Sequence, residues 1–180
     1  MSTLSRSITA TGLAIAVAIT AFVTPPAPAS AAPSAADGTA LDRAGWSVTA
    51  SHSHPDTPAT NMLDGSLQTG WTSGKGQQAF PDDPEEIVLD TGTESAFDTI
   101  VLSAGAALDD YARGYAVAVS DDGTTWTDVT QGNGSLADGE MRIALCGDAS
   151  ACAQTTARFV RIRQTSWHYV NWWTVAELNL

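Results

Sequence analysis

The stretch YAVAVSDDGTTW, residues 115–126, decides the fold class of this 180-residue chain. Its first half, YAVAVS, is short and rich in residues that favour β-strands. DDGTTW (121–126) follows it directly, and the pair Asp122-Gly123 within it favours the tight turn of a β-hairpin. Trp126 would then begin the returning strand. The stretch therefore predicts two antiparallel strands joined by a short turn.

Similar runs recur along the chain, separated by glycine, aspartate, asparagine and proline. Several of them alternate apolar and polar residues, which is the two-residue period of half-buried strands. No segment keeps a helical apolar stripe beyond about two turns. These spacings predict an all-β sandwich or barrel. The expected strands are 46–50, 85–90, 98–104, 115–120, 141–145, 157–164 and 174–180.

The first 31 residues have the composition of a secretory signal peptide. Arg6 is their only charge, and the apolar run at 11–23 is too short to cross a bilayer. A proline-rich patch and the small residues 29–31 follow, as at a cleavage site. We therefore expect a secreted, extracellular protein with a signal peptide (1–31), a flexible leader (32–40) and one domain (41–180).

The chain is strongly acidic, with 20 Asp and Glu residues against 8 Lys and Arg, and a net charge of −12. Without the segment 1–31, the net charge is one unit more negative. Such a surface repels phosphate backbones and anionic lipid headgroups. Nucleic acid and anionic membranes are therefore excluded as expected partners.

Two cysteines, Cys146 and Cys152, lie close together in CGDASAC. In an exported chain with an even cysteine count, a disulfide between them is the default prediction. A metal or redox role is the alternative, but no histidine lies nearby in sequence and the CxxC spacing is absent.

No sequence motif for catalysis is present: the chain has no GxSxG, HExxH or P-loop motif. The acidic segment PDDPEE (81–86) offers carboxylates. Glycosidic chemistry, however, needs two carboxyls that face each other across a bond, roughly 5–10 Å apart. We expect 81–86 to be a solvated acidic loop, and the chain not to be an enzyme.

Four stretches together resemble the discoidin, or coagulation-factor type C, domain, and within it the family 32 carbohydrate-binding modules. The resemblance extends across the whole of the expected domain and implies a jelly-roll β-sandwich. It also implies that Trp71 and Trp126 are core residues. The four stretches are TNMLDGSLQTGW (60–71), YAVAVSDDGTTW (115–126), ARFVRIR (157–163) and WWTVAELNL (172–180).

The resemblance implies a structural calcium ion at the loop DGSLQTGW (64–71). Calcium takes six to eight oxygen ligands, and the glycine after Asp64 permits a turn that aims carbonyl groups inward. Sodium would be a weaker substitute, and a plain turn is the alternative. Two departures from the family pattern are Ser66, where Asp or Asn is frequent, and Gly70, where Arg is frequent. The implied ligands are the carbonyls of Asn61, Ser66 and Ala176, the carboxylates of Asp64 and Glu177, and Thr69.

Three loops carry residues suited to sugar binding, which combines an aromatic face with hydrogen-bonding groups. We expect these loops at one rim of the sandwich, together with the ion loop. Of the neighbours Trp172 and Trp173, alternation places one inward and one outward. For His52 and His54, a transition-metal site is the alternative, though a third ligand is not evident. The predicted sugar-binding residues are His52, His54, Asp109, Tyr111, Arg113, Trp167, His168, Asn171 and Trp172.

The sequence thus predicts a non-catalytic, carbohydrate-binding domain with calcium as a structural brace. Relatives bind galactosides, N-acetylhexosamine glycans and glucans, and the twin tryptophans favour an extended polymer. The second expectation is an extracellular adhesion domain that binds a protein partner through the same rim.

Overall fold

The structure is a computed structural model that describes residues 39–146 and 154–180. The described residues belong to one unit, Ser34–Leu180. The expected signal peptide (1–31), most of the leader (32–40) and Cys152 lie outside the described residues, so secretion and the Cys146–Cys152 disulfide stay predictions. Within the described ranges, no helix has the length and hydropathy that crossing a bilayer requires.

Nearly all regular structure in the described residues is β, with one short 3-10 helix, η1. The all-β prediction is therefore confirmed. The strands are β1 (Ser47–Ala50), β2 (Trp71–Thr72), β3 (Glu86–Phe97), β4 (Thr99–Ser103), β5 (Gly114–Ser120), β6 (Thr127–Asn133), β7 (Glu140–Ala144), β8 (Thr155–Gln164), β9 (Thr174–Val175) and β10 (Glu177–Asn179), with η1 at Ala59–Leu63.

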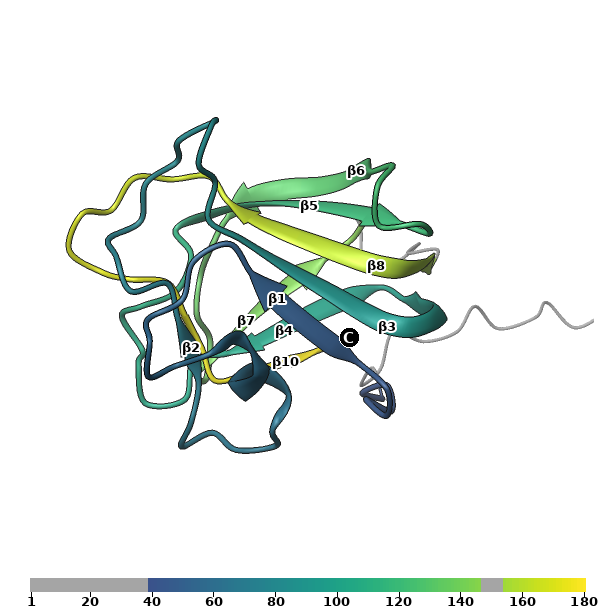
Figure 1. The fold of residues 1–180 in the computed structure, drawn as a ribbon, viewed down its shortest axis with the longest axis horizontal. Helices are drawn as coiled ribbons and strands as arrows, with labels where there is room; N and C mark the ends of the chain where they lie inside the picture. The colour runs from purple at the N-terminus through teal and green to yellow at the C-terminus, as the bar shows by residue number, and fades with distance from the viewer. Residues whose placement is uncertain (1–38, 147–153) are drawn as a thin grey trace, which may run out of the picture. The chain divides into compact units, whose positions relative to one another are not determined.

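Two antiparallel sheets form the layers of a sandwich (Figure 1). One has the order β1-β3-β8-β5-β6 and the other β10-β4-β7, while β2 and β9 form a small sheet of their own. In strands such as β3 and β4, alternate residues face the space between the layers. Ile87 and Leu89 of β3 and Ile100 and Leu102 of β4 are examples, each at most 3% exposed. The two-residue period in the sequence is thus the pattern of one buried face.

The hairpin read from residues 115–126 is present. β5 pairs antiparallel with β6, and Gly123 in the turn has φ +71, a left-handed conformation that glycine adopts without strain. Trp126 precedes β6 and is only half-buried; the Arg161 guanidinium lies 4.4 Å from its ring centre. The assignment of Trp126 to the core is therefore wrong, because its ring lies against a cation of β8, the strand on the other side of β5, instead of entering the sandwich.

Trp71 is a core residue as expected, with 1% of its surface exposed. Its ring meets the ring of Trp173 edge to face at 5.2 Å, and Trp71 pairs with Val175 across the small sheet. The Trp71 indole N–H donates to the carbonyl of His52 at 2.9 Å. The β2–β9 sheet therefore ties the loop after β1 and the last loop of the chain to the core.

Candidate ligand-binding surface

Four loops meet at one end of the sandwich, at the left of Figure 1. They are residues 51–58 after β1, 73–85 between β2 and β3, 104–113 between β4 and β5, and 165–173 between β8 and β9. These loops carry every predicted sugar-binding residue. The ion loop is their neighbour, because a Cβ built on Gly105 would lie 2.7 Å from the carbonyl oxygen of Leu67.

Gln77 joins three of these loops, although it is fully buried. Its side-chain amide donates to the carbonyls of Tyr111 (2.8 Å) and Trp172 (3.0 Å). Its side-chain oxygen accepts from the N–H of Arg113 at 2.9 Å, and its backbone pairs with His168 in a β-bridge. Sequence reasoning missed Gln77, because nothing in the sequence distinguishes this buried glutamine from its half-buried neighbour Gln78.

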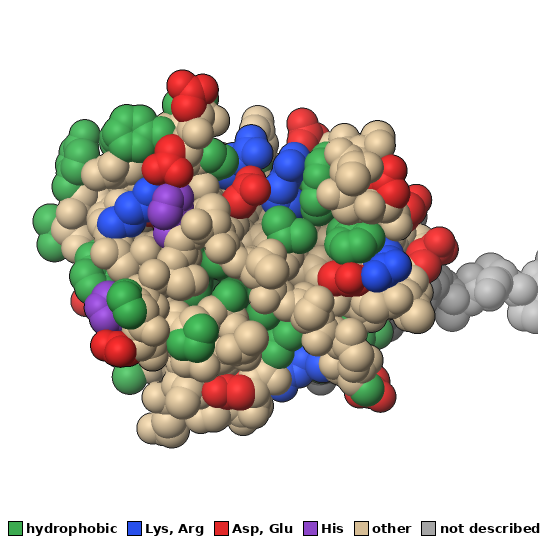
Figure 2. Space-filling model, viewed as in Figure 1, with side chains coloured by type: hydrophobic (Ala, Val, Ile, Leu, Met, Phe, Trp, Pro, Cys, Tyr) green, Lys and Arg blue, Asp and Glu red, His purple; other side chains and the backbone are tan. Residues whose placement is uncertain are grey.

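Aromatic side chains cover this end of the molecule in two groups. Phe80 and Trp167 meet edge to face at 4.8 Å, and Tyr169 lies 5.9 Å from Trp167. Trp172 stacks on His54 at 5.8 Å with an interplanar angle of 26°. The four larger rings remain open to solvent, with exposed fractions of 44% for Phe80, 48% for Trp167, 73% for Tyr169 and 37% for Trp172. Figure 2 shows hydrophobic side chains gathered over these loops, with histidines and acidic groups among them.

The twin tryptophans divide as alternation requires. Trp173 is 1% exposed and belongs to the core, whereas Trp172 is exposed and stacks on His54. Asp110, from the loop 104–113, fixes the backbone at Trp172. Its carboxylate accepts from the side-chain amide of Asn171 (3.1 Å) and from the Trp172 N–H (3.2 Å). The exposed Trp172 is therefore held in place by a carboxylate from another loop.

The remaining predicted residues form two polar groups. His52 lies 3.0 Å from Asp83 and 3.2 Å from Lys75, and Lys75 lies 3.2 Å from Asp83. The hydrogen bond from Lys75 holds the pKa of Asp83 below its usual range. In the second group, the Arg113 guanidinium lies 3.8 Å above the Tyr111 ring and donates to the Asp109 carbonyl at 2.7 Å. Both cations of this surface thus already have partners within the chain.

His168 and Asn171 belong to the frame of the last loop. The Asn171 N–H donates to the His168 ring at 3.0 Å, and the His168 N–H donates to the Gln77 carbonyl at 2.9 Å. The structure therefore brings the predicted residues of the three loops to one surface, in which His168 and Asn171 hold the loop and Trp167 and Trp172 present their faces. Sequence reasoning left Phe80 and Lys75 out of this surface.

Glu85 departs from the sequence expectation. Asp82 and Asp83 are exposed as a solvated loop requires, but Glu85 is 1% exposed, and within the described residues neither of its carboxylate oxygens has a hydrogen-bond partner. The Gln164 N–H donates to the Glu85 carbonyl at 2.8 Å, which extends the β3–β8 pairing and draws the residue inside. Burial raises the pKa of Glu85 to about 7, against a lowering by the charge of Lys75.

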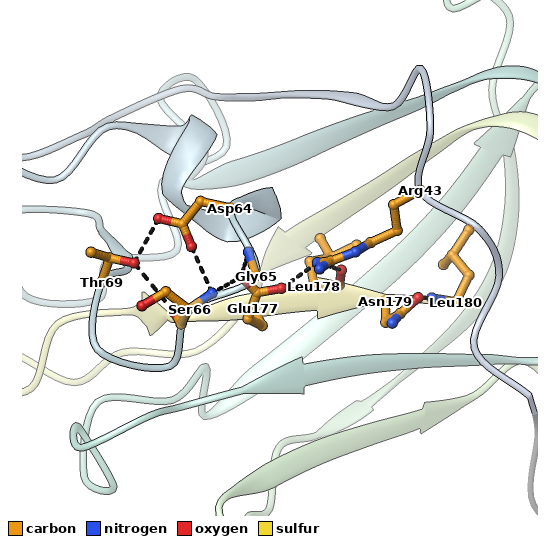
Figure 3. A network of polar contacts seen from close by, with 9 residues as sticks. All are labelled: Arg43, Asp64, Gly65, Ser66, Thr69, Glu177, Leu178, Asn179 and Leu180. Atoms are coloured by element: carbon orange, nitrogen blue, oxygen red, sulfur yellow. Dashed lines mark hydrogen bonds and ion pairs between the residues drawn. The ribbon is translucent and has the colours of Figure 1, made fainter.

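The predicted ion loop brings its side chains together (Figure 3). The Thr69 hydroxyl donates to Asp64 at 2.6 Å. The Ser66 N–H lies 2.9 Å from one oxygen of Asp64 and 3.0 Å from one oxygen of Glu177. The hydrogen bond from Thr69 holds the pKa of Asp64 below its usual range, and the Ser66 N–H acts in the same direction. Two carboxylates and a hydroxyl thus converge on one short turn.

The oxygen-rich donor set suits a hard cation such as calcium. Ser66 also presents its carbonyl, 3.3 Å from the Thr69 hydroxyl. Arg43 pairs with the outer oxygen of Glu177, so one charge of the two carboxylates is already balanced. In the described part of the chain, no three His, Cys, Asp or Glu side chains gather to hold a metal ion. A cation here would therefore depend on two carboxylates supplemented by hydroxyl and backbone oxygens.

The sequence model of the F5/8 type C domain matches residues 47–178. None of the curated proteins matches the chain. Among solved structures, the chain resembles the family 32 carbohydrate-binding module of Clostridium perfringens NanJ, in complex with galactose. The two are 17% identical with a TM-score of 0.64, over 78% of this chain and 96% of that chain.

Two further structures share the fold. The family 32 module of AlyQ, in complex with 4,5-unsaturated mannuronic acid, is 22% identical, with a TM-score of 0.59 over 79% of this chain and 97% of that chain. Chitosan-binding module 1 from a Paenibacillus sp. IK-5 chitosanase/glucanase is 25% identical, with a TM-score of 0.57 over 75% of this chain and 92% of that chain.

Proposed function

The chain belongs to the F5/8 type C domain family, and on that premise we propose that it is a non-catalytic carbohydrate-binding module. Its ligand is a glycan, which it takes at the loop end of the sandwich. Its role is to bind and not to cleave, since the sequence carries none of the catalytic motifs considered above.

One observation carries this proposal: four large aromatic rings stand exposed on loops that are rigidly joined. Sugar rings present C–H faces that stack on such aromatic faces. The loops cannot easily bury these rings against one another, because Gln77 and Asp110 fix their backbones. The sugar complexes of the NanJ and AlyQ modules support a glycan ligand for this fold.

Replacing Trp167 with alanine is expected to weaken glycan binding about tenfold, because it removes the centre of the Phe80–Trp167–Tyr169 group. The fold should persist, since 48% of the Trp167 side chain faces solvent. The measurement is a pull-down of the purified protein with insoluble polysaccharides, followed by affinity measurement on the one that binds.

Trp126→Ala is the control, because it removes a half-buried tryptophan ring from the β5–β6 hairpin, away from the four loops. Equal binding by the parent and the Trp167 variant would place the site elsewhere. If the folded parent binds no glycan, whereas an extracellular protein is captured through the same aromatic residues, the adhesion function replaces the one proposed.

We also propose that the ion loop binds calcium as a structural brace. Asp64, Thr69 and Glu177 would supply side-chain oxygens, with backbone carbonyls from the residues the family pattern implies. Bound calcium would add positive charge where two carboxylates meet, and would hold η1 and the start of β10 together.

Calcium at about one hundred times its dissociation constant is expected to stabilise the parent by about 2.7 kcal/mol. Asp64→Ala should lose this response, because it removes one of the two carboxylates. The measurement is thermal unfolding with calcium and with chelator. Asp82→Ala serves as a control for removal of an exposed carboxylate. An equal calcium response in Asp64→Ala and the parent would contradict the site.

A further inference from the structure

The two aromatic groups are joined by a short strip of half-buried backbone, residues 74–76, whose two glycines pack against the loops on either side. A Cβ built on Gly74 would lie 3.2 Å from His54, and one built on Gly76 would lie 2.4 Å from the Tyr169 carbonyl oxygen. The strip thus touches the His54–Trp172 group at one end and the loop of Tyr169 at the other. Two residues of chain span at most about 7 Å, so the backbones of His54 and Tyr169, which carry the two groups, are close neighbours.

No side chain rises from the strip to separate the groups. Gly74 and Gly76 have none, and Lys75 directs its ammonium group to Asp83 and His52. Gly74 has φ +73, which a residue with a side chain would adopt only with strain. The surface therefore runs from Trp172 and His54 across glycine backbone to Tyr169, Trp167 and Phe80.

The rings on this surface are open and not enclosed. The three rings of the larger group keep between 44% and 73% of their surface exposed, and Val170 beside them is 82% exposed. A pocket that surrounds the end of a glycan would bury its rings much more deeply. An open row of rings instead suits sugar units whose neighbours continue on both sides.

We propose that this row, from His54 and Trp172 to Phe80, is a track for internal units of an extended polysaccharide. The inference rests on the proposed carbohydrate-binding function and names its ligand class: a polymer bound along its length. Each aromatic group stacks on one unit, and no side chain of the strip stands between the two units. Affinity then increases with the number of units, because both groups are occupied only by a longer ligand.

The charged side chains beside the aromatic row indicate which charge the polymer can carry. Lys75 is paired with Asp83, and Arg113 is held by the Asp109 carbonyl and the Tyr111 ring. Asp56 and Asp82 stand exposed beside the two aromatic groups. A polyuronic acid would bring its carboxylates against these aspartates and against a chain with a net charge of −12, and the Arg113 guanidinium is the cation of this surface that no described carboxylate pairs. The polymer therefore carries no carboxylates on the units that contact the track.

Oligosaccharides of β-1,4-glucan, β-1,3-glucan and chitin, from monosaccharide to hexasaccharide, test this proposal by calorimetric titration of the purified protein. We expect affinity for one series to rise at least about tenfold from monosaccharide to hexasaccharide, given a few-fold contribution from each stacked ring. Chemical modification of both terminal units of the hexasaccharide should leave its affinity within about twofold. Oligogalacturonates of matched length should bind more weakly, with a difference that shrinks in high salt.

Trp172→Ala and Trp167→Ala each remove one group and leave the other. In either variant, hexasaccharide and disaccharide should bind within about twofold of each other, whereas Trp126→Ala should keep the full length dependence. A monosaccharide that binds the parent as tightly as the hexasaccharide, or a ligand that needs an unmodified end, would overturn the track but keep the sugar-binding function. If the folded parent binds no glycan of any length, the proposed function itself fails.

Discussion

Replacing Glu85 with glutamine is expected to stabilise the protein above pH 7 by roughly 3 kcal/mol. Burial raises the pKa of Glu85 from 4.5 to about 7, so the folded protein holds a proton on this carboxyl that the unfolded chain has released. Each pKa unit corresponds to about 1.4 kcal/mol. Below pH 4.5 the carboxyl is protonated in both states and the free energy of unfolding of the parent is not reduced by Glu85. As the pH rises from 4.5 through 7, this free energy falls, because the folded protein must bury a carboxylate.

The parent should therefore lose stability between pH 4.5 and pH 7, whereas Glu85→Gln should not. Below this range, Asp90 has the opposite effect, because the hydrogen bonds from Arg158 lower its pKa and its protonation destabilises the fold. Urea unfolding at a series of pH values measures both effects: the loss of stability from Glu85 as the pH rises, and the loss from Asp90 as the pH falls. Glu94→Gln, at an exposed position of β3, is the control and should follow the parent. A parent profile that is flat from pH 4.5 to pH 7 would contradict the buried, unpartnered state of Glu85.

Gln77→Leu is expected to destabilise the protein by at least about 3 kcal/mol, because it leaves three polar groups without partners and each such buried group costs about 1–3 kcal/mol. The leucine would leave the Tyr111 and Trp172 carbonyls without their donor. It would also leave the Arg113 N–H without its acceptor, whereas the Gln164 amide would keep the Ser166 carbonyl. Because these groups belong to different loops, glycan affinity should fall together with stability.

Gln78→Leu is the matched control, since the neighbouring glutamine is half-buried and should tolerate the same change. Urea unfolding gives the change in free energy, and binding to the identified polysaccharide gives the change in affinity. Equal stability of the two variants would show that Gln77 does not join the loops. Loss of stability without loss of affinity would show that the hydrogen bonds of Gln77 stabilise the fold but do not position the aromatic side chains for binding.

Strands such as β3 and β4 were predictable because they bury one face, and one buried face gives the sequence a two-residue period of apolar and polar residues. The turn at Gly123 was predictable because few residues adopt its backbone conformation. The two-residue strand β2 was not predictable, because its two residues are too few to show a period. The position of Trp126 was mispredicted for a different reason: its ring packs on Arg161 from β8, a contact between residues far apart in the sequence.

The ligand-binding surface was only partly predictable, because it too depends on contacts between residues far apart in the sequence. Clusters such as SWHYVNWW are visible in the sequence, and alternation correctly required that one of Trp172 and Trp173 face outward. The burial of Glu85 and Gln77 depends on strands and loops that meet only in the folded chain. Phe80 was overlooked because it is an isolated apolar residue in a polar loop, and only the position of Trp167 gives it a role.

The measurement that most directly tests the account is an NMR titration of the six tryptophan indole N–H signals with the polysaccharide fragment that binds. The account predicts that the signals of Trp167 and Trp172 shift. The signals of Trp71 and Trp173, which lie in the core, should stay unchanged, as should that of Trp126 on the distant hairpin. Shifts confined to Trp126, or binding that leaves Trp167 and Trp172 unmoved, would contradict a glycan site on the aromatic loops.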